Sequence, residues 1–391
     1  MTNIFRLAIF KKYSLEILFG TSLSIILFDR FRWSERIGLG EILLGISLYI
    51  SILLISFNFQ NTRIRNIGDK WTLLLILFFF VCMLPITLIN YFYFSIYGSA
   101  LMGLAAYLIC FSFLLTISFL NLNYNLIGLV TVFLVIFFSF LFMGDLDAWY
   151  GTTRLRYTAS SDNPNRLAIY MLTSLVIISQ ASIQFVYKFL MLIIICALTY
   201  LTLSDASMLG ILAMIFSYII FIVYRSKYLS PFLFLMAFLF ITFVFLNFDD
   251  IYKFAIDLWY GASVGDYRFN LMLNGLSAWT RDPVSMIIGN GSGVFSGVSR
   301  PYEGWESHST PIDLLSIGGI IGFSLFYIPI VFSIYQFQQH GENFAASALI
   351  GLVIFLTFIY AGRHPIVWFV VYISFMNSIK LYNNYKKSRI Y

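Results

Sequence analysis

Charged residues are scarce in this sequence. Only 11% of its 391 residues are Asp, Glu, Lys or Arg, whereas 60% are hydrophobic and 19% are aromatic. A soluble domain of this length could not hold such a composition without large exposed apolar patches. The low charge therefore excludes a soluble protein. It predicts a protein whose solvent is the lipid bilayer, with aromatic side chains at the membrane interfaces.

Cysteine is also rare. Cys82, Cys110 and Cys196 lie in apolar runs, and no CxxC or CxxH spacing joins them. This excludes a disulfide framework and a thiolate metal site. The sequence has no HExxH spacing, and we interpret the DxD pair Asp145 and Asp147 as residues that hold their loop, with metal binding as the less favoured alternative.

Long apolar runs are the main feature that is present. A membrane-spanning helix needs about 20 mostly apolar residues. The runs predict an all-α polytopic membrane protein, a single integral membrane domain over 1–391 with about twelve transmembrane helices, in which the boundary near Ser204 and Asp205 is the least defined. The expected spans are 14–29, 37–57, 72–90, 99–120, 125–143, 166–184, 188–204, 206–224, 231–248, 311–335, 345–361 and 366–380.

The basic residues predict an orientation for these helices. Lys and Arg gather in short loops and tails that lie on the cytoplasmic side if both termini are cytoplasmic. The first apolar run lacks a small-residue cleavage site, so we expect it to remain as a helix. The polar segments 144–165 and 249–307 then form two large outer loops, which we expect to contain short helices.

Lysine and arginine are segregated between the two sides. In this orientation eight of the nine Lys are cytoplasmic, whereas ten of the fifteen Arg are on the outer face. The positive-inside rule accounts for the Lys, but the outward Arg oppose it and need another cause. A guanidinium group binds phosphate oxygens through two parallel hydrogen bonds and keeps its charge. The pattern therefore predicts an anionic ligand on the outer face.

The first outer loop carries three of these arginines. Arg154 and Arg156 precede the run Asn-Pro-Asn-Arg over 163–166, which leads directly into an apolar helix. An Asn before that helix can cap it, so that its N-terminal amides point into the loop. We expect the three Arg to form a phosphate-binding cradle. The alternative is that they reach lipid headgroups at the helix end.

The second outer loop adds Arg268 and Arg281, followed by a glycine-rich run at 289–293. That run lacks the Lys-Ser/Thr pair of a phosphate loop, so it predicts a tight turn. The loop ends with Glu306 and His308, directly before an apolar helix.

A His at that position can exchange a proton near neutral pH or orient a hydroxyl group. The alternative for His308 is a cap or a solvated side chain. His364, beside Arg363, is a weaker candidate on the same face.

Over roughly 125–330 this layout resembles the O-antigen polymerase and O-antigen ligase superfamily of bacterial envelope glycosyltransferases. Three segments carry the resemblance, and they occur in the order typical of that superfamily. They are Asn163-Pro164-Asn165-Arg166-Leu167-Ala168, then Arg268 with Asp282-Pro283 and Gly289-Asn-Gly-Ser-Gly293, and then Glu306-Ser-His308-Ser309 before Gly318-Gly319-Ile-Ile-Gly322. Two departures are Ser309, where the family has Asn, and Asp205, where it has Arg.

The resemblance implies transfer of a glycan from an undecaprenyl-diphosphate carrier at the periplasmic face of a bacterial inner membrane, without nucleotide sugar, metal or another cofactor. The implied catalytic residues are His308, which would activate the acceptor hydroxyl, and Arg268 and Arg156, which would stabilise the leaving diphosphate. The implied substrate contacts are Arg154, Arg166, Asn163, Asn165, Tyr157, Arg281 and Glu306, the last also an alternative base. Aromatic residues that could stack on sugar rings are Trp149, Tyr150, Tyr157, Trp279, Tyr302 and Trp305.

The expected partners are the lipid-linked oligosaccharide, membrane lipids and a chain-length regulator, with no nucleic acid. Within the superfamily, we favour a polymerase, because the Phe-, Ile-, Tyr- and Asn-rich composition is typical of surface-polysaccharide gene clusters; a ligase that transfers glycan to the lipid A core is the alternative. A lipid-linked oligosaccharide flippase is the alternative of another class. A transporter would be expected to carry charge inside its helices and an internal repeat. Here the polar residues gather in two outer loops instead.

Overall fold

The computed structural model describes residues 2–32, 38–57, 67–94, 99–144, 146–148, 155–161, 163–225, 231, 264–292 and 307–388. Helices make up most of this part of the chain. In the first half they are α1 (Thr2–Ile25), the short 3-10 helix η1 (Asp29–Phe31), α2 (Leu39–Phe57), α3 (Ile67–Phe78), α4 (Leu84–Phe94), α5 (Ser99–Phe119) and α6 (Tyr124–Leu141). A π-helical turn, η3 (Phe79–Met83), joins α3 to α4.

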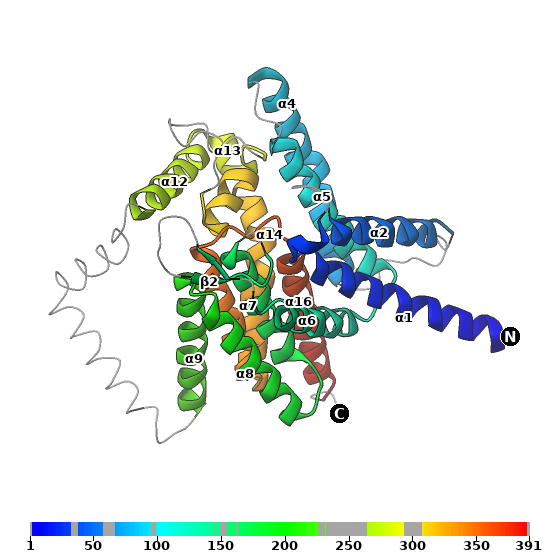
Figure 1. Cartoon of the computed structure of the whole chain (residues 1–391). Helices are drawn as coiled ribbons and strands as arrows, with labels where there is room; N and C mark the ends of the chain where they lie inside the picture. Colours follow the sequence, from blue (N-terminus) through cyan, green and yellow to red (C-terminus); the bar gives the residue numbers. More distant parts are fainter. Residues whose placement is uncertain are drawn as a thin grey trace.

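The second half is also helical. Its helices are α7 (Pro164–Gln180), α8 (Phe185–Leu201), α9 (Asp205–Arg225), α12 (Val264–Trp279), α13 (Pro283–Ile288), α14 (Thr310–His340), α15 (Asn343–Thr357) and α16 (Pro365–Ser388). The turn at 202–204 separates α8 from α9, at the boundary that the sequence defined least. In Figure 1, α9 and α14 run up the page, whereas α1 and α2 run across it, so the helices do not form one parallel bundle.

The described part of the chain is that of an all-α, membrane-embedded protein. Seven helical stretches are long and apolar enough to cross a membrane: Leu39–Ser56, Ile67–Phe92, Ala100–Phe119, Tyr124–Leu141, Asp205–Arg225, Thr310–His340 and Pro365–Lys386. The helices Phe185–Leu201 and Asn343–Thr357 are apolar but shorter. A helix lies at each span expected from the sequence except 231–248, of which only residue 231 is described.

The first outer loop differs from the prediction of short helices. Its described residues form two strands, β1 (Leu146–Ala148) and β2 (Leu155–Tyr157), which pair antiparallel with Asp147 opposite Arg156. Successive side chains of a strand point to opposite faces, so Arg156 and Tyr157 face opposite sides of β2. In the segment 249–307, the described residues include the helices α12 and α13.

Helix α7 lies at the centre of the molecule. All its residues from Leu167 to Ser179 are buried, and it packs against α6, α8, α9, α15 and α16, several of which surround it in Figure 1. A second part of the core lies on α16, where the Trp368 ring meets Phe111 and Phe326 edge to face, with ring centroids 4.9 and 4.8 Å apart. Such edge-to-face pairs add to the stabilisation from buried area.

Helix α14 is interrupted near its middle. Gly319 has φ 58°, outside helical values, so the carbonyls of the preceding turn are free to bond elsewhere. The segment after α13 takes them: Asn290 N donates to Ser316 O at 2.8 Å, and Gly291 N donates to Ile317 O at 3.0 Å. The glycine-rich run is therefore the tight turn that its sequence predicted, and it joins the second outer loop to a broken helix.

Candidate functional site

Arg166 joins the start of α7 to the end of α1. Asn163 caps α7 by accepting a hydrogen bond from Asn165 N at 2.8 Å, and Pro164 occupies the first turn, as expected for an Asn-Pro helix start. Two residues further on, Arg166 Nη2 donates to Ile26 O at 2.8 Å. The cap thus fixes the position from which the guanidinium group reaches α1.

Two carboxylates lie near this arginine: Asp29 in the α1–α2 connection and Glu41 in the first turn of α2. Arg166 Nη1 lies 3.8 Å from Asp29 Oδ1, and Arg32 Nε lies 3.1 Å from the same oxygen. Arg32 Nη2 also lies 3.5 Å from Glu41 Oε1. Because these side chains are partly shielded from water, their charges interact more strongly than exposed pairs do.

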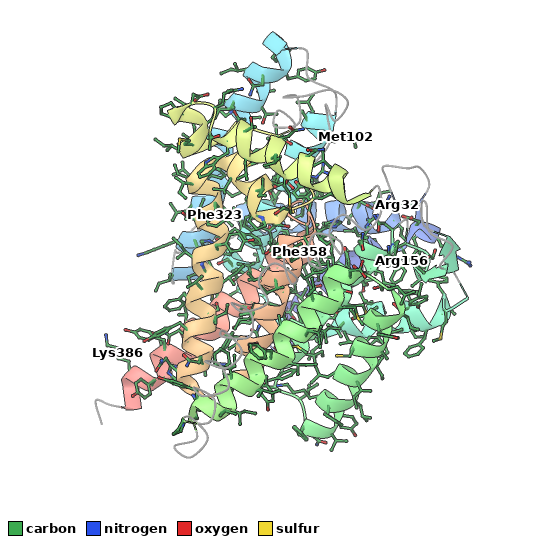
Figure 2. The ribbon with its side chains drawn as sticks, turned by 90° about the vertical axis from the view of Figure 1, so that its left-hand side faces the viewer. Arg32, Met102, Arg156, Phe323, Phe358 and Lys386 are labelled. Carbon is green, nitrogen blue, oxygen red and sulfur yellow. The ribbon has the colours of Figure 1, made fainter. Side chains whose placement is uncertain are left out.

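Arg156 lies close to this network, and Figure 2 shows it on the same side of the molecule as Arg32. Its Nε donates to Thr202 O at 2.8 Å, and its Nη2 donates to Asn165 Oδ1 at 3.3 Å. Arg156 therefore ties the β-hairpin both to the α8–α9 turn and to the first turn of α7.

The connection between α15 and α16 supplies a further arginine, Arg363. The Arg363 guanidinium lies 5.0 Å from the centre of the Tyr360 ring, a cation–π distance. Tyr360 shares a hydrogen bond of 3.2 Å with the hydroxyl of Tyr107 on α5, and the Arg363 carbonyl accepts from Cys110 Sγ at 3.6 Å. These contacts hold Arg363 against α5.

His364 senses the charge of three arginines. It interacts electrostatically with Arg166, Arg363 and Arg32, which we name the arginine cluster. Burial, aided by these three positive charges, lowers the pKa of the imidazole from 6.5 to about 3. His364 is therefore neutral at physiological pH, and the positive charge of the cluster resides on the guanidinium groups.

The turn that carries His308 is attached to the same region. His308 has φ 52°, an uncommon value for a residue with a Cβ. Its neighbour Ser307 donates its N–H to Asp313 Oδ1 at 3.1 Å. Thr310 donates its N–H to Ile359 O at 3.1 Å, and Thr310 Oγ1 accepts from Ala361 N at 2.9 Å. The His308 turn is thus bound to the segment that leads into Arg363.

Two of the buried polar atoms that have no hydrogen-bond partner among the described residues are candidates for contact with a ligand near the arginine cluster. One is the hydroxyl of Tyr170, which interacts electrostatically with Arg166 and Arg32. The other is Asp313 Oδ2, whose carboxyl group interacts with Tyr107 and Tyr360. Burial of an unpartnered polar atom is costly, so such atoms are candidates for contact with a ligand.

The structure brings together only some of the site residues that were predicted from the sequence. Arg156, Arg166, Asn163 and Asn165 come together at the start of α7. Tyr157, in contrast, is buried and donates its hydroxyl to Ser139 O on α6, which fastens the hairpin to the protein.

Arg281 takes part in another group, in the turn between α12 and α13. Its Nε lies 3.1 Å from Asp282 Oδ2, and its side chain is exposed. Asp282 caps α13 by accepting from Ser285 N at 2.8 Å. Trp279, in the same group, donates its indole N–H to Met286 O at 3.0 Å.

Several proposed residues cannot be placed. Arg268 is on α12, but its side chain lies outside the described part of the protein. The other proposed residues outside the described ranges are Arg154, Glu306, Trp149, Tyr150, Tyr302 and Trp305.

Sequence reasoning gave little weight to Arg32, Tyr170, Asp313 and Arg363, which the structure places in or beside the site. The excess of Arg on the predicted outer face was a signal for Arg32 and Arg363. No short-range pattern marked Tyr170 or Asp313, because both are single polar residues inside apolar helices.

Within the described residues, no group of three or more His, Cys, Asp or Glu side chains is arranged to hold a metal ion. No protein-family model matches the chain, and no curated protein matches it. The chemistry of the site therefore has to be argued from its own geometry.

Proposed function

We propose that this protein is a membrane glycosyltransferase that transfers a glycan from an undecaprenyl-diphosphate carrier to a lipid-linked repeat unit, as an O-antigen polymerase does. The observation that carries the proposal is the arginine cluster beside the His308 turn. Arg166 on α7, Arg32 in the α1–α2 connection and Arg363 in the α15–α16 connection all interact electrostatically with the neutral imidazole of His364. Asp29 and Glu41 lie next to Arg32 and Arg166.

The proposed reaction needs such an environment. The acceptor hydroxyl oxygen bonds to the anomeric carbon of the donor glycan, while the bond from that carbon to the diphosphate oxygen breaks. The hydroxyl proton passes to a base, and undecaprenyl diphosphate leaves with an additional negative charge. Fixed cations in a site that excludes water stabilise this charge more in the transition state than in the ground state.

The contacts suggest different roles for the arginines. Arg156 and Arg166 donate to backbone carbonyls, which supports a role in holding the site in shape. Arg363 stacks on Tyr360 and is our choice for the main diphosphate contact, with Arg268 as a second. His308 accepts the proton of the acceptor, with Glu306 as the alternative base.

In its full form the proposal places about twelve spans in a bacterial inner membrane, with both termini cytoplasmic and the arginine cluster on the periplasmic face. The acceptor is a second lipid-linked oligosaccharide, and a chain-length regulator is the expected protein partner. The prenyl chain of the carrier lies in the bilayer beside the hydrophobic helices, while its diphosphate lies at the membrane–water interface.

The test is a lipopolysaccharide gel from a strain that lacks this gene and from strains restored with wild type, Arg363→Ala or His308→Ala at equal protein levels in the membrane. Arg225→Ala is the control for loss of an arginine elsewhere, because Arg225 donates to Gln338 O at the far end of α14. We expect the ladder of O-antigen lengths with wild type and the control, and core with a single repeat unit with the other two variants.

Other outcomes would contradict this proposal. Bare core in the deletion strain would indicate a ligase or a flippase. Full ladders with both Arg363→Ala and His308→Ala would show that the arginine cluster is not the site of the reaction.

A further inference from the structure

A groove lies between α3, α14 and α16, away from the arginine cluster. Its volume is about 440 Å³. The cluster lies near the Thr310 end of α14, whereas the α14 residues that line the groove run from Ile320 to Pro329, beyond the break at Gly319. Side chains that define its walls include Lys70, Leu74, Ile321, Ser324, Ile328 and Phe375.

The floor of the groove is held in place by Trp71. Its indole N–H donates to Leu325 O at 3.0 Å, and its ring stacks on Tyr372 with 6.3 Å between ring centroids. The Phe375 ring meets it edge to face at 5.8 Å. Because the Trp71 N–H is already bonded, the floor offers an apolar ring surface, and the groove is formed before anything enters it.

The described lining of the groove is mostly apolar. Lys70, on the first turn of α3, is the one charged residue among the described residues that line it. Its sequence neighbour Asp69 is buried and accepts a hydrogen bond from Ser118 on α5, so that carboxylate faces the protein interior. The groove thus pairs a long apolar surface with one exposed cation.

This combination identifies the chemistry of an occupant. An apolar chain would fill the surface along Leu74, Ile321 and Ile328, while an anionic group would lie at Lys70. Basic residues beside membrane helices attract anionic lipid headgroups, and the exposed walls belong to candidate membrane spans. An anionic phospholipid has both an apolar acyl chain and a negatively charged headgroup.

We propose that this groove is a binding site for an anionic phospholipid, with one acyl chain against Trp71 and the phosphate at Lys70. The site is distinct from the arginine cluster and does not depend on the glycosyltransferase proposal. It predicts a preference for lipid charge that ordinary contact between helices and bilayer would not produce.

Trp71 allows the site to be tested directly. The full chain, purified in a neutral detergent, is titrated with phosphatidylglycerol or phosphatidylcholine carrying brominated acyl chains, which quench nearby tryptophan fluorescence. The fluorescence lost on going from wild type to Trp71→Phe reports Trp71. We expect phosphatidylglycerol to quench this component at a several-fold lower concentration than phosphatidylcholine.

Lys70→Gln should abolish that preference. Lys188→Gln, on α8 and outside the groove, is the matched control and should retain it. A second measurement avoids any loss of stability in Trp71→Phe: native mass spectrometry of wild type and Lys70→Gln should show fewer phosphatidylglycerol molecules retained by the variant.

Three results would overturn the proposal. Equal quenching by both lipids, unchanged in Lys70→Gln, would mean ordinary surrounding lipid only. Displacement of brominated phosphatidylglycerol by undecaprenyl phosphate at far lower concentration than by unlabelled phosphatidylglycerol would assign the groove to a prenyl chain. Protection of Trp71 that increases with protein concentration would assign it to a second copy of this chain.

Discussion

The indole N–H of Trp71 donates a hydrogen bond of 3.0 Å to the carbonyl of Leu325. That carbonyl is four residues before Pro329, which lies inside α14 and has no N–H to donate. Proline in a helix interior removes one backbone hydrogen bond, and within a membrane no water can replace it. A side chain from α3 therefore satisfies the carbonyl that Pro329 leaves without its helical donor.

Trp71→Phe should lower the stability of the protein, because it leaves the Leu325 carbonyl without this donor. We expect a loss of about 1–3 kcal/mol in wild type. In a Pro329→Ala background the new Ala N–H can bond to Leu325 O, so the same substitution should cost less. Thermal unfolding of the four proteins in detergent measures the difference, and equal losses in both backgrounds would contradict the interpretation.

Gly319→Ala should be strongly destabilising. Gly319 has φ 58°, and a Cβ there would lie 2.4 Å from the carbonyl oxygen of Ile287. The substitution would force apart α13 and the broken region of α14, with an expected cost above about 2 kcal/mol. The measurement is the melting temperature together with the amount of protein in the membrane.

Gly45→Ala is the control for that experiment. Gly45 is in the middle of α2, and no atom lies within 4 Å of the place where its Cβ would be. Replacing an unhindered helical Gly by Ala favours the helix by up to about 1 kcal/mol. A similar loss of stability in both variants would show that the break in α14 has no special need for glycine.

Arg156→Ala should reduce stability by about 1–3 kcal/mol, because it leaves Thr202 O and Asn165 Oδ1 without their donor. Arg156→Lys should restore only part of the loss, since one ammonium group cannot reproduce a planar fork with two contacts. Arg281→Ala is the comparison: its exposed pair with Asp282 should contribute less than about 1 kcal/mol. Equal effects of Arg156→Ala and Arg281→Ala would rule out a structural role for Arg156.

His364 should make stability depend on pH. Its pKa is lowered from 6.5 to about 3 in the folded protein, so the unfolded chain takes up the proton first as the pH falls. Stability from this residue is complete above about pH 6.5 and declines as the pH falls towards 3. Melting temperatures of wild type should therefore fall more than those of His364→Gln between about pH 7 and about pH 4.5; parallel curves would exclude a buried neutral imidazole.

The same pKa separates the two histidines in an activity assay. A neutral His364 does not change its charge between about pH 5 and 8. If polymerisation has an acidic limb in that range, His364→Gln should keep the limb, whereas His308→Gln should abolish activity. Loss of the limb in His364→Gln alone would contradict a neutral His364 in this pH range.

Local features of the sequence determined much of this protein. Long apolar runs determined the helices, because a chain in a bilayer must satisfy its backbone hydrogen bonds within each segment. The Asn163–Pro164 pair determined where α7 begins, and the glycine run at 289–293 indicated a turn, because capping and positive φ depend on a few adjacent residues. The hairpin in the first outer loop was missed because its strands are only three residues long.

Only the tertiary structure decided how the polar side chains are used. It assigned Arg166 to the Ile26 carbonyl and Trp71 to the Leu325 carbonyl, and it brought Arg32 and Arg363 beside His364. No sequence spacing marks such partners, because they lie on helices far apart in the chain and meet only through packing. In a mostly apolar interior, a charge or a carbonyl without a partner is costly. The whole fold decides which partner each of these groups meets.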